Sequence, residues 1–302
     1  MPRIDAPLET ALARLRDSPP DPARPVLLAG PTASGKSALA LALSEAQGRV
    51  IINADALQVY EMWRVLTARP EARDCARVPH FLYGGVGRDQ DWSVGHWLRA
   101  LDPLLRAHPT AIIVGGTGLY FRALTEGLVT LPPTPAALRA EADAHLARAG
   151  LAALVAELDP KTRARIDTRN PARVQRAWEV QAATGQGLAH WQDQTPPPLL
   201  ARAQATALVL RPDVEWLNAR IDQRFEQMLN AGALEEVRAA LPHWQPQAPW
   251  ARAIGAPELI AHLQGQISWD EARQAATLAT RQYAKRQRTW FRNRMRDWDA
   301  LI

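Results

Sequence analysis

Eight consecutive residues near the N-terminus have the pattern of a phosphate-binding loop. They read Gly-Pro-Thr-Ala-Ser-Gly-Lys-Ser and match G-x-x-x-x-G-K-[ST] at every fixed position. Glycine at both ends lets the backbone fold around an anion with its N–H groups pointing inward, while Lys36 adds a point charge and Ser37 a hydroxyl for Mg²⁺. The pattern predicts a diphosphate site, with a loop kept only for its structural role as the alternative. Its residues are Gly30, Pro31, Thr32, Ala33, Ser34, Gly35, Lys36 and Ser37.

The residues on either side of this loop favour the phosphate-binding interpretation. An apolar run at 25–30 predicts a buried strand, and a helical pattern at 37–47 places a helix dipole behind a bound anion. A later predicted strand at 111–114, where a nucleotide hydrolase would carry a metal-binding acid, ends in Gly115-Gly116-Thr117. Because no Asn-Lys-x-Asp motif for guanine is present either, a GTPase is excluded and a motor ATPase is disfavoured.

Two polar residues that follow predicted strands are the candidates for catalysis. Asp55 comes after the apolar run at 50–52, and Thr117 comes after the strand at 111–114. Ligands of doubly wound sheets bind beyond the carboxyl ends of the strands, so both residues should face the same crevice as the phosphate loop. Asp55 can act as a general base, form hydrogen bonds to the ligands of Mg²⁺ without binding the ion itself, or cap a helix that begins at Ala56. Thr117 can cap the next helix, donate to a substrate oxygen, or do both.

The order of the predicted elements indicates an α/β fold. Strands and helices alternate over the first 125 residues, and such alternation implies a parallel sheet with helices on both faces. After a long helical block, one more strand returns the chain to the sheet. The expected strands are 25–30, 50–52, 111–114 and 206–210, and the expected core helices are 37–47, 94–106, 119–124, 214–230, 233–241 and 269–296.

Two proline clusters, at 131–135 and 195–198, enclose a helical block rich in arginine and alanine. Such a block between two hinges is typical of an inserted domain. We therefore predict a P-loop NTPase-like parallel sheet core with helices on both faces, together with an all-helical insertion domain. The expected division is a core of residues 25–132 and 202–302, an insertion of residues 133–201, and a peripheral extension of residues 1–24.

Composition excludes several classes of protein. Of the 302 residues 47% are apolar and 22% charged, as in ordinary globular proteins. A single cysteine, Cys75, excludes a disulfide framework, a Cys-rich zinc site and an iron–sulfur cluster. No apolar run approaches the ~18 residues of a membrane span, and the first twenty residues carry charges without an apolar segment. We therefore expect a cytoplasmic protein without a membrane partner.

Arginine is concentrated in two helical stretches, although the net charge of +5 is modest. Residues 281–296 carry seven positive side chains and no negative one, and Arg281, Lys285 and Arg288 share one helix face. Such a face favours nucleic-acid binding over a merely solvated helix. The second concentration, at 163–176, favours the same interpretation; a kinase-type lid over phosphates and ordinary surface charge are its alternatives.

Several stretches together resemble one family, the tRNA dimethylallyltransferases (tRNA isopentenyltransferases). The phosphate loop, Ile52–Tyr60, Val114–Tyr120, Asn170–Val180 and Thr280–Arg292 carry the resemblance, with shorter matches between them. Together they extend from Pro25 to Arg294. The chain departs from the family pattern at a few positions, namely Ala56 for serine, Leu66 for glycine, Phe81 for histidine, Ala256 for tyrosine, and Trp63-Arg64 for a small and an acidic residue.

The resemblance implies a prenyl transfer to tRNA. The loop would hold the diphosphate of dimethylallyl diphosphate with Mg²⁺ on Ser37, and the acceptor would be the exocyclic N6 amine of the adenine immediately 3′ of the anticodon. Asp55 would accept the amine proton, Thr117 would steady the reacting groups, and the adenine would leave its stack to react. The tRNA contacts that the resemblance implies are Asp55, Ala56, Leu57, Gln58, Thr117, Arg139, Ala172, Arg173, Val174, Gln175, Arg176, Arg281, Lys285 and Arg288.

The expected protein is thus a monomeric transferase whose partners are dimethylallyl diphosphate and the anticodon stem-loop of tRNA. Two other functions remain open from the residues. A small-metabolite P-loop kinase would depend on ATP and not on tRNA, and the helical insertion and basic C-terminal helix argue against it. A non-prenylating, ATPase-like nucleic-acid-binding module is disfavoured by the missing acid at the strand end.

Overall fold

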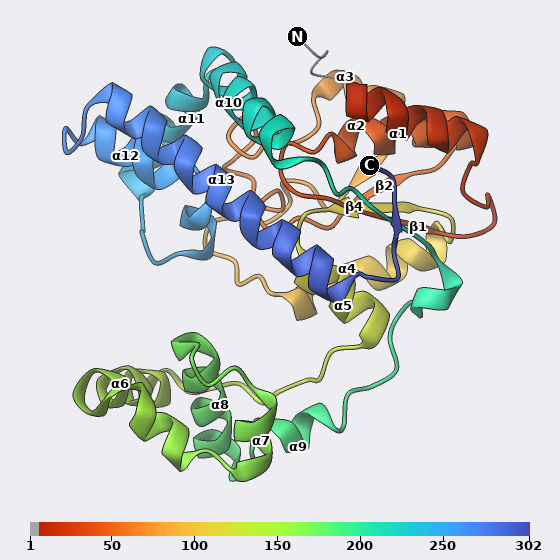
Figure 1. Ribbon diagram of the computed structural model, residues 1–302. Coiled ribbons are helices and arrows are strands. Elements are labelled where there is room, and N and C mark those ends of the chain that lie inside the picture. Colours follow the sequence, from red (N-terminus) through yellow and green to blue (C-terminus); the bar gives the residue numbers. More distant parts are fainter. Residues whose placement is uncertain (1–5) are drawn as a thin grey trace. The chain divides into compact units, whose positions relative to one another are not determined.

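The computed structural model describes residues 6–302, which form two compact units (Figure 1). One unit combines the chain up to Thr125 with Leu199–Ile302, and the other consists of Glu126–Pro198. The expected boundaries at 132/133 and 201/202 are therefore displaced toward the N-terminus by a few residues. The reason is that the chain leaves the sheet-containing unit where helix α5 (Gly118–Glu126) ends, before the first proline cluster is reached.

A six-stranded, entirely parallel sheet forms the centre of the first unit, in the order β3-β2-β4-β1-β5-β6. This confirms the predicted α/β fold. The two outer strands were not predicted, because two residues are too short to carry a sequence pattern. The strands are β1 (Val26–Ala29), β2 (Ile51–Asn53), β3 (His80–Phe81), β4 (Ile112–Gly115), β5 (Thr206–Val209) and β6 (Asp299–Ala300).

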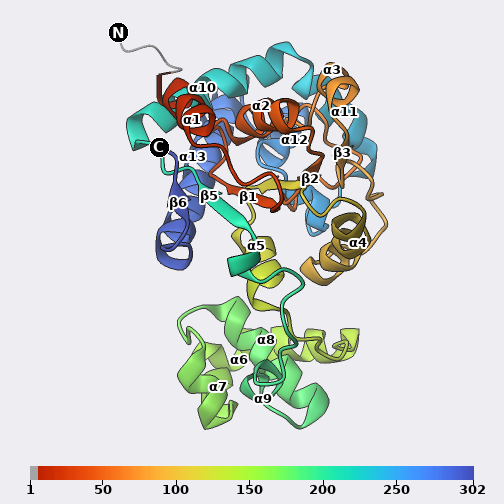
Figure 2. The same cartoon turned by 90° about the vertical axis from the view of Figure 1, so that its right-hand side faces the viewer.

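Alternation along the strands gives the sheet two buried faces. Leu27 and Ile113 point into an apolar cluster with α4, α5 and the C-terminal part of α13, whereas Leu28 and Ile112 point to the other face, toward α1 and α2. Figure 2 shows α1 and α2 on one side of β1 and β2 and α4 and α5 on the other. The helices of this unit are α1 (Ala6–Asp17), α2 (Lys36–Gln47), α3 (Ala72–Arg77), α4 (Val94–Ala107), α5, α10 (Val214–Asn230), α11 (Ala233–Ala240), α12 (Ala256–Leu263) and α13 (Trp269–Arg294).

The N-terminal segment is part of the core, not the peripheral extension that its composition predicts. Within α1, Ala11 and Leu15 are buried against Leu39 and Leu43 of α2. Leu8 of the same helix lies directly against Gly35, where a Cβ would be 2.5 Å from its Cδ1 atom. The helix thus backs the phosphate loop. Residues 1–5 of the expected extension lie outside the described residues.

The second unit is entirely helical among its described residues. Its helices α6 (Ala136–Glu157), α7 (Pro160–Arg165), α8 (Pro171–Thr184) and α9 (Leu188–Gln192) share a small core that includes Leu154, Val174 and Trp178. Helix α8 begins at a side-chain cap, because the oxygen of Asn170 accepts from the Arg173 N–H and Pro171 occupies the first turn. In residues 6–302 no helix is long and apolar enough to cross a membrane.

From the end of β4 to the start of α5 the chain approaches its neighbours so closely that a side chain would clash. A Cβ on Gly115 would lie 2.0 Å from the Ala54 carbonyl oxygen, and one on Gly116 would lie 2.2 Å from the Gln287 amide nitrogen. On Gly118 it would lie 2.1 Å from Nε1 of Trp290. The glycines of this motif therefore let β2, β4 and α13 meet at the same edge of the sheet.

We expect Gly115→Ala to lower the free energy of unfolding by about 3 kcal/mol, the upper end of the usual cost of overpacking, because the opposing atom belongs to backbone that cannot rotate away. Urea denaturation followed by far-UV circular dichroism measures it. Gly85→Ala is the matched control, since a Cβ there has no neighbour within 4 Å, and its effect should stay below about 0.5 kcal/mol. Equal effects of the two variants would contradict the close approach.

Candidate active site

Three neighbouring strands deliver the candidate residues to one edge of the sheet. Strand β1 runs into the phosphate loop, β2 leads to Asp55, and β4 leads to Thr117. Because β4 pairs with both β1 and β2 in parallel, the carboxyl ends of all three lie side by side. The structure thus brings together the phosphate loop and both predicted catalytic residues, as the sheet-edge argument requires.

The phosphate loop has the geometry of an anion cradle. No side chain caps α2, whose N-cap is Gly35 with φ of 85°, so the first-turn amides remain available to a bound anion. Ser34 is fully buried, and its hydroxyl has no hydrogen-bond partner among the described residues. Lys36 is also buried, and its Nζ lies 3.3 Å from the Pro31 carbonyl oxygen.

Burial lowers the pKa of the Lys36 ammonium to about 8, Asp55 opposes this decrease, and Arg224 adds to it. The lysine is therefore held without the water that would normally solvate its charge. An anion bound in the cradle would restore that solvation and favour the charged form.

Gln287 of α13 fixes the phosphate loop against the loop after β4. Its side-chain oxygen accepts from the Thr32 N–H at 2.8 Å, and its amide nitrogen donates to the Gly116 carbonyl at 2.9 Å. The side chain is only 6% exposed, so both polar ends have a protein partner in place of water. Gln287 lies in the stretch 280–292 that carries the family resemblance, but the resemblance assigns it no role.

Asp55 shapes a turn and does not cap a helix. Its Oδ1 accepts from the Leu57 N–H at 3.0 Å, and its own N–H donates to the Asn53 side chain at 2.8 Å. No helix begins at Ala56, so the capping alternative is wrong. These bonds hold the carboxylate in the pocket that Lys36 also lines.

Thr117 joins the turn of Asp55 to the loop after β4. Its hydroxyl oxygen accepts from the Ala56 N–H at 2.9 Å, and its backbone N–H donates to the Ala54 carbonyl at 3.2 Å. The two catalytic candidates are therefore positioned by one shared set of hydrogen bonds.

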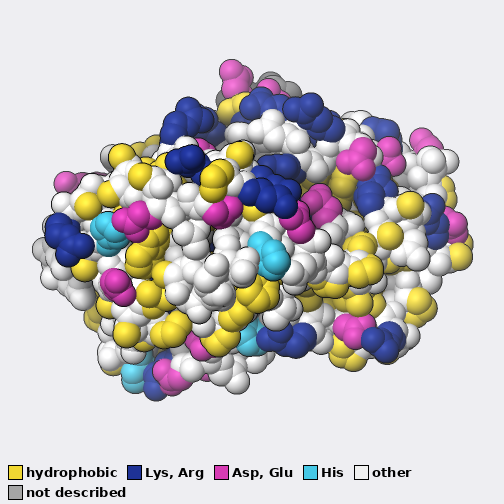
Figure 3. Space-filling view, turned by 90° about the horizontal axis from the view of Figure 1, so that it is seen from below, with side chains coloured by type: hydrophobic (Ala, Val, Ile, Leu, Met, Phe, Trp, Pro, Cys, Tyr) yellow, Lys and Arg dark blue, Asp and Glu magenta, His cyan; other side chains and the backbone are white. Residues whose placement is uncertain are grey.

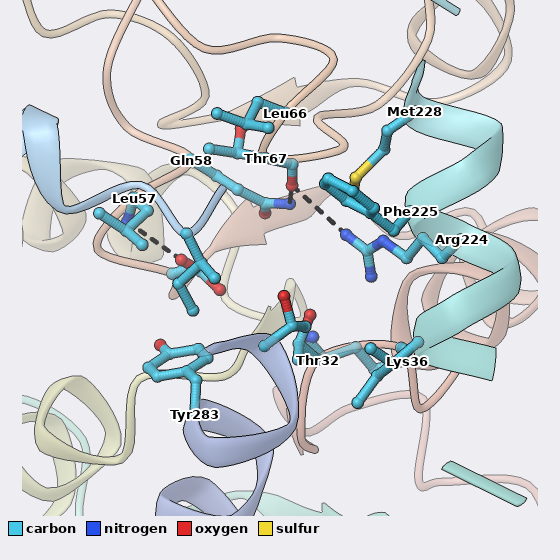
Figure 4. A pocket seen from close by; sticks show the side chains of 15 residues that line it. Thr32, Lys36, Leu57, Gln58, Leu66, Thr67, Arg224, Phe225, Met228 and Tyr283 are labelled. Carbon is cyan, nitrogen blue, oxygen red and sulfur yellow. Dashed lines mark hydrogen bonds between the residues drawn. The ribbon is translucent and has the colours of Figure 1, made fainter. Parts of the chain in front are cut away.

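The pocket at this edge has a charged end and an apolar end. Thr32 and Lys36 lie at one end of the view in Figure 4, Leu66 and Met228 lie at the other, and Arg224 reaches in from α10 between them. Residues from the middle and the C-terminal part of the chain complete the lining. The full set is Thr32, Ala33, Lys36, Asp55, Leu57, Gln58, Leu66, Thr67, Ile221, Arg224, Phe225, Met228, Ile254, Thr280 and Tyr283.

Arg224 was not identified from the sequence. It lies beside Leu217, Ile221 and Phe225, which are buried on the core face of α10, and its Nη2 is 3.5 Å from the Thr67 carbonyl. Burial lowers the pKa of Arg224, while the charge of Asp55 opposes that effect. An arginine among regularly spaced apolar positions is the signal that could have revealed it.

Tyr283 of α13 faces the same pocket, and the family resemblance assigns it no role either. Burial raises the pKa of its phenol, the charge of Asp55 adds to the increase, and hydrogen bonds to Thr117 and Gln287 oppose it. The phenol therefore stays protonated at neutral pH. It can donate a hydrogen bond near the two catalytic candidates.

The donor set of the phosphate loop fits Mg²⁺. Ser37 is exposed next to Lys36 at the start of α2, and Mg²⁺ in phosphate sites takes one or two protein ligands while keeping several waters. Within residues 6–302 no group of three or more His, Cys, Asp or Glu residues could hold a metal by itself. A single hydroxyl with phosphate oxygens and water is thus the arrangement that these residues can supply.

The predicted basic face of α13 divides into two parts. Arg281 forms an ion pair with Asp222 of α10 at 2.5 Å, so its charge is partly neutralised. Lys285 and Arg288 line a separate cleft together with Arg211 and Arg292. The sequence could not show this difference, because Asp222 is remote along the chain.

The predicted tRNA contacts of the helical unit also differ in exposure. Arg139, Ala172 and Arg173 are exposed, whereas Arg176 bonds to Thr134 and to the buried Glu179. On the face drawn in Figure 3, basic side chains are interspersed with acidic and apolar ones.

Two neighbouring residues of α8 that are predicted to contact tRNA differ in burial. The side chain of Val174 is fully buried in the core of its unit, so the expectation that it contacts tRNA is wrong for that side chain. Gln175 is half-buried, and its amide nitrogen donates to Asp143 at 2.6 Å. A resemblance along the chain cannot tell an inward-facing position of a helix from an outward-facing one.

Residues 58–294 match the family described as IPP transferase. A relative from Cereibacter sphaeroides (strain KD131), named tRNA dimethylallyltransferase, is 65% identical over 290 residues, which cover 96% of this chain and 92% of the relative. The solved tRNA isopentenylpyrophosphate transferase of Bacillus halodurans is 28% identical with a TM-score of 0.63, over 92% of this chain and 90% of that one. A eukaryotic dimethylallyltransferase acting on tRNA shares the fold at 23% identity and a TM-score of 0.72, over 88% of this chain and 69% of that one.

We expect the affinity for inorganic pyrophosphate to change little with the ionisation of Lys36 below about pH 8 and to fall above it, by up to about tenfold per pH unit. The reason is that the depressed pKa of about 8 removes the ammonium charge there. Isothermal titration calorimetry at pH 7, 8, 9 and 10 measures the trend. Lys36→Ala should bind weakly without this decrease, and a wild-type affinity unchanged between pH 8 and 10 would contradict the prediction.

Proposed function

This chain belongs to the IPP transferase family and prenylates tRNA, and we propose that the pocket at the sheet edge is where it attaches a dimethylallyl group to an adenine. The placement of Asp55 beside the phosphate loop, with Thr117 bound to the same turn, is the observation that carries the proposal. A loop that binds a diphosphate and a carboxylate that accepts a proton are the two elements that this transfer needs.

The proposed donor is dimethylallyl diphosphate, and the acceptor is the exocyclic N6 amine of the adenine immediately 3′ of the anticodon. The amine nitrogen forms a bond to C1 of the allyl group while the bond from C1 to the diphosphate oxygen breaks. Diphosphate leaves with that electron pair, and one N6 proton passes to the Asp55 carboxylate. The products are the N6-substituted adenosine in tRNA and diphosphate.

The charged side chains of the pocket favour departure of the diphosphate from the allyl group. In the proposed reaction Lys36 and Arg224 face the negative charge that accumulates on the departing diphosphate, and their limited contact with solvent makes the attraction stronger than it would be in water. Mg²⁺ held on Ser37 would neutralise part of the diphosphate charge. The turn of Asp55 fixes Oδ1 through the Leu57 N–H, and in the proposed reaction the carboxylate accepts the amine proton.

Exclusion of water is the second requirement. The reacting allylic carbon becomes cation-like, and water would hydrolyse it. The apolar lining around Leu66 and Phe225 keeps one side of the pocket dry, and the adenine would cover the other once it has left its stack. We propose that Thr117, whose hydroxyl oxygen is bonded to the turn of Asp55, steadies the reacting groups.

Each unit separately offers basic side chains to tRNA in the proposed function. Arg139 and Arg173 of the helical unit carry charge toward solvent, and Lys285 and Arg288 line the basic cleft of α13. Phosphates of the anticodon stem-loop carry the negative charge that pairs with such side chains. We propose a monomer acting in the cytoplasm; the alternative functions of a small-metabolite kinase and of a non-prenylating module find no support in the relatives.

The direct test is incubation of unmodified tRNA with the protein, dimethylallyl diphosphate and Mg²⁺, followed by mass spectrometry of the nucleosides. We expect an adenosine heavier by one dimethylallyl group with the wild type and none with Lys36→Ala. The variant should still bind tRNA with nearly unchanged affinity. Absence of the product with a folded wild-type protein would refute the proposed function.

We expect Asp55→Asn to lower kcat by about 10²–10⁴-fold, the usual contribution of a positioned general base, with little change in KM for dimethylallyl diphosphate. The reason is that asparagine keeps the hydrogen bond to Leu57 but cannot accept a proton. Steady-state kinetics measures both constants. Near-normal kcat combined with weaker tRNA binding would make Asp55 an anchor for the adenine and not the base.

We expect the double variant Arg139→Ala, Arg173→Ala to reduce the salt dependence of tRNA binding. Each phosphate contact contributes about 0.7–0.9 to the slope of log affinity against log salt, so losing two contacts should reduce the slope by about 1.4–1.8. Filter binding between 50 and 300 mM KCl would supply the slope. Arg106→Ala is the control because its exposed side chain is paired with Asp102; a slope that is the same in all three proteins would place the tRNA surface elsewhere.

A further inference from the structure

We propose that Glu236 of α11, whose side chain does not line the pocket, is a positioning residue that sets how Arg224 meets the diphosphate. It acts through the backbone of residues 64–68, which we call the pocket turn. This inference rests on the proposed function and adds to it a residue that supports the site from outside.

The carboxylate of Glu236 accepts three consecutive backbone N–H groups of the pocket turn. Oε1 accepts from Arg64 at 2.6 Å and from Val65 at 2.9 Å. Oε2 accepts from Leu66 at 2.8 Å. Consecutive amides that point the same way occur at the start of a helical turn, where a negative charge is the favoured partner. Because all three bonds go to the backbone, they do not depend on which side chain stands at position 66.

The pocket turn is closed by its own backbone and ends in a strained residue. The N–H of Ala68 donates to the Val65 carbonyl at 2.9 Å. Ala68 itself has φ of 48°, in the left-handed region that alanine rarely adopts. Such a conformation persists only where the surrounding contacts hold it. The three bonds to Glu236 are contacts of that kind.

The carbonyl groups at the end of the pocket turn bind two side chains that line the pocket. The amide nitrogen of Gln58 donates to the Thr67 carbonyl at 2.8 Å and to the Ala68 carbonyl at 3.1 Å. Nη2 of Arg224 lies 3.5 Å from the same Thr67 oxygen, as Figure 4 shows. Gln58 and Arg224 both line the pocket. A displacement of the turn would therefore move an acceptor that the two side chains share.

Arg224 is the side chain through which the pocket turn acts on the diphosphate in the proposed reaction. A guanidinium is planar and rigid, so a bond at one N–H group fixes the direction of the others. The Thr67 carbonyl thereby orients the N–H groups of Arg224 that remain for the diphosphate. Because a misplacement of about 1 Å can lower a rate by about 10²-fold, a residue that holds this carbonyl contributes to catalysis without contacting the substrate.

The neighbouring glutamate of α11 provides a matched control. Glu235 is exposed and lies 3.8 Å from Arg238 of the same helix. Glu235→Gln changes charge and size as Glu236→Gln does, but its ion-pair partner belongs to α11 itself. A general effect of removing one negative charge from this helix would appear in both variants.

The test is a double-mutant cycle on the affinity for inorganic pyrophosphate, measured with the full chain by isothermal titration calorimetry in the presence of Mg²⁺. We expect Glu236→Gln to weaken binding by about tenfold, an effect of the size that directly linked residues show. The reason is that glutamine presents a donor where one carboxylate oxygen accepted. Glu235→Gln should leave the affinity unchanged. When Arg224→Ala is already present, adding Glu236→Gln should cause no further loss, because the side chain that Glu236 positions is gone.

The cycle separates positioning from a general effect on the fold. Equal weakening by Glu236→Gln with and without Arg224→Ala would overturn the proposal, because the effect would not pass through Arg224. Equal effects of Glu235→Gln and Glu236→Gln would overturn it as well. Should Glu236→Gln fail to fold, Glu236→Asp takes its place, since its shorter carboxylate cannot reach all three amides; its effect should likewise disappear when Arg224→Ala is present.

Product formation by the wild type, measured by mass spectrometry of the tRNA nucleosides, distinguishes the two levels of the argument. A folded wild type that forms no prenylated adenosine refutes the proposed function itself. An active wild type whose pyrophosphate affinity is the same in Glu236→Gln overturns only the role of Glu236.

Discussion

The two hydrogen bonds of Gln287 are the constraint on which the site depends. One buried amide joins the phosphate loop at Thr32 to the loop after β4 at Gly116, so α13 sets the spacing between them. Gly116 is required because a Cβ would occupy the position of that amide. A shift of α13 would move the diphosphate cradle away from the turn that carries Asp55, and with it the reacting groups.

Burial limits the solvation of the charged side chains in the pocket. Lys36 is buried and Arg224 is half-buried, and Asp55 is the acid whose charge acts on each of them. Two cations beside one carboxylate leave net positive charge, which a diphosphate would balance. The free-energy cost of holding these cations away from water is thus offset when the donor binds. Because the cations are already desolvated, they attract the diphosphate more strongly than they would in water.

A single loop connects the charged end of the pocket to its apolar end. Thr67 contacts the side chains of Gln58 and Arg224, while the neighbouring Leu66 packs against Gly255. Glu236 holds the loop from outside through three backbone amides.

The sequence by itself determined the parallel α/β core, the phosphate loop and the positions of Asp55 and Thr117, because strand ends and loop motifs are local patterns. It also carried the family resemblance. Only the tertiary structure decided that α1 belongs to the core, that Val174 is buried, and that Arg224, Tyr283 and Gln287 complete the site. Arg224, Tyr283 and Gln287 lie more than a hundred positions from the loops that they contact. No local pattern encodes which faces of distant helices will meet.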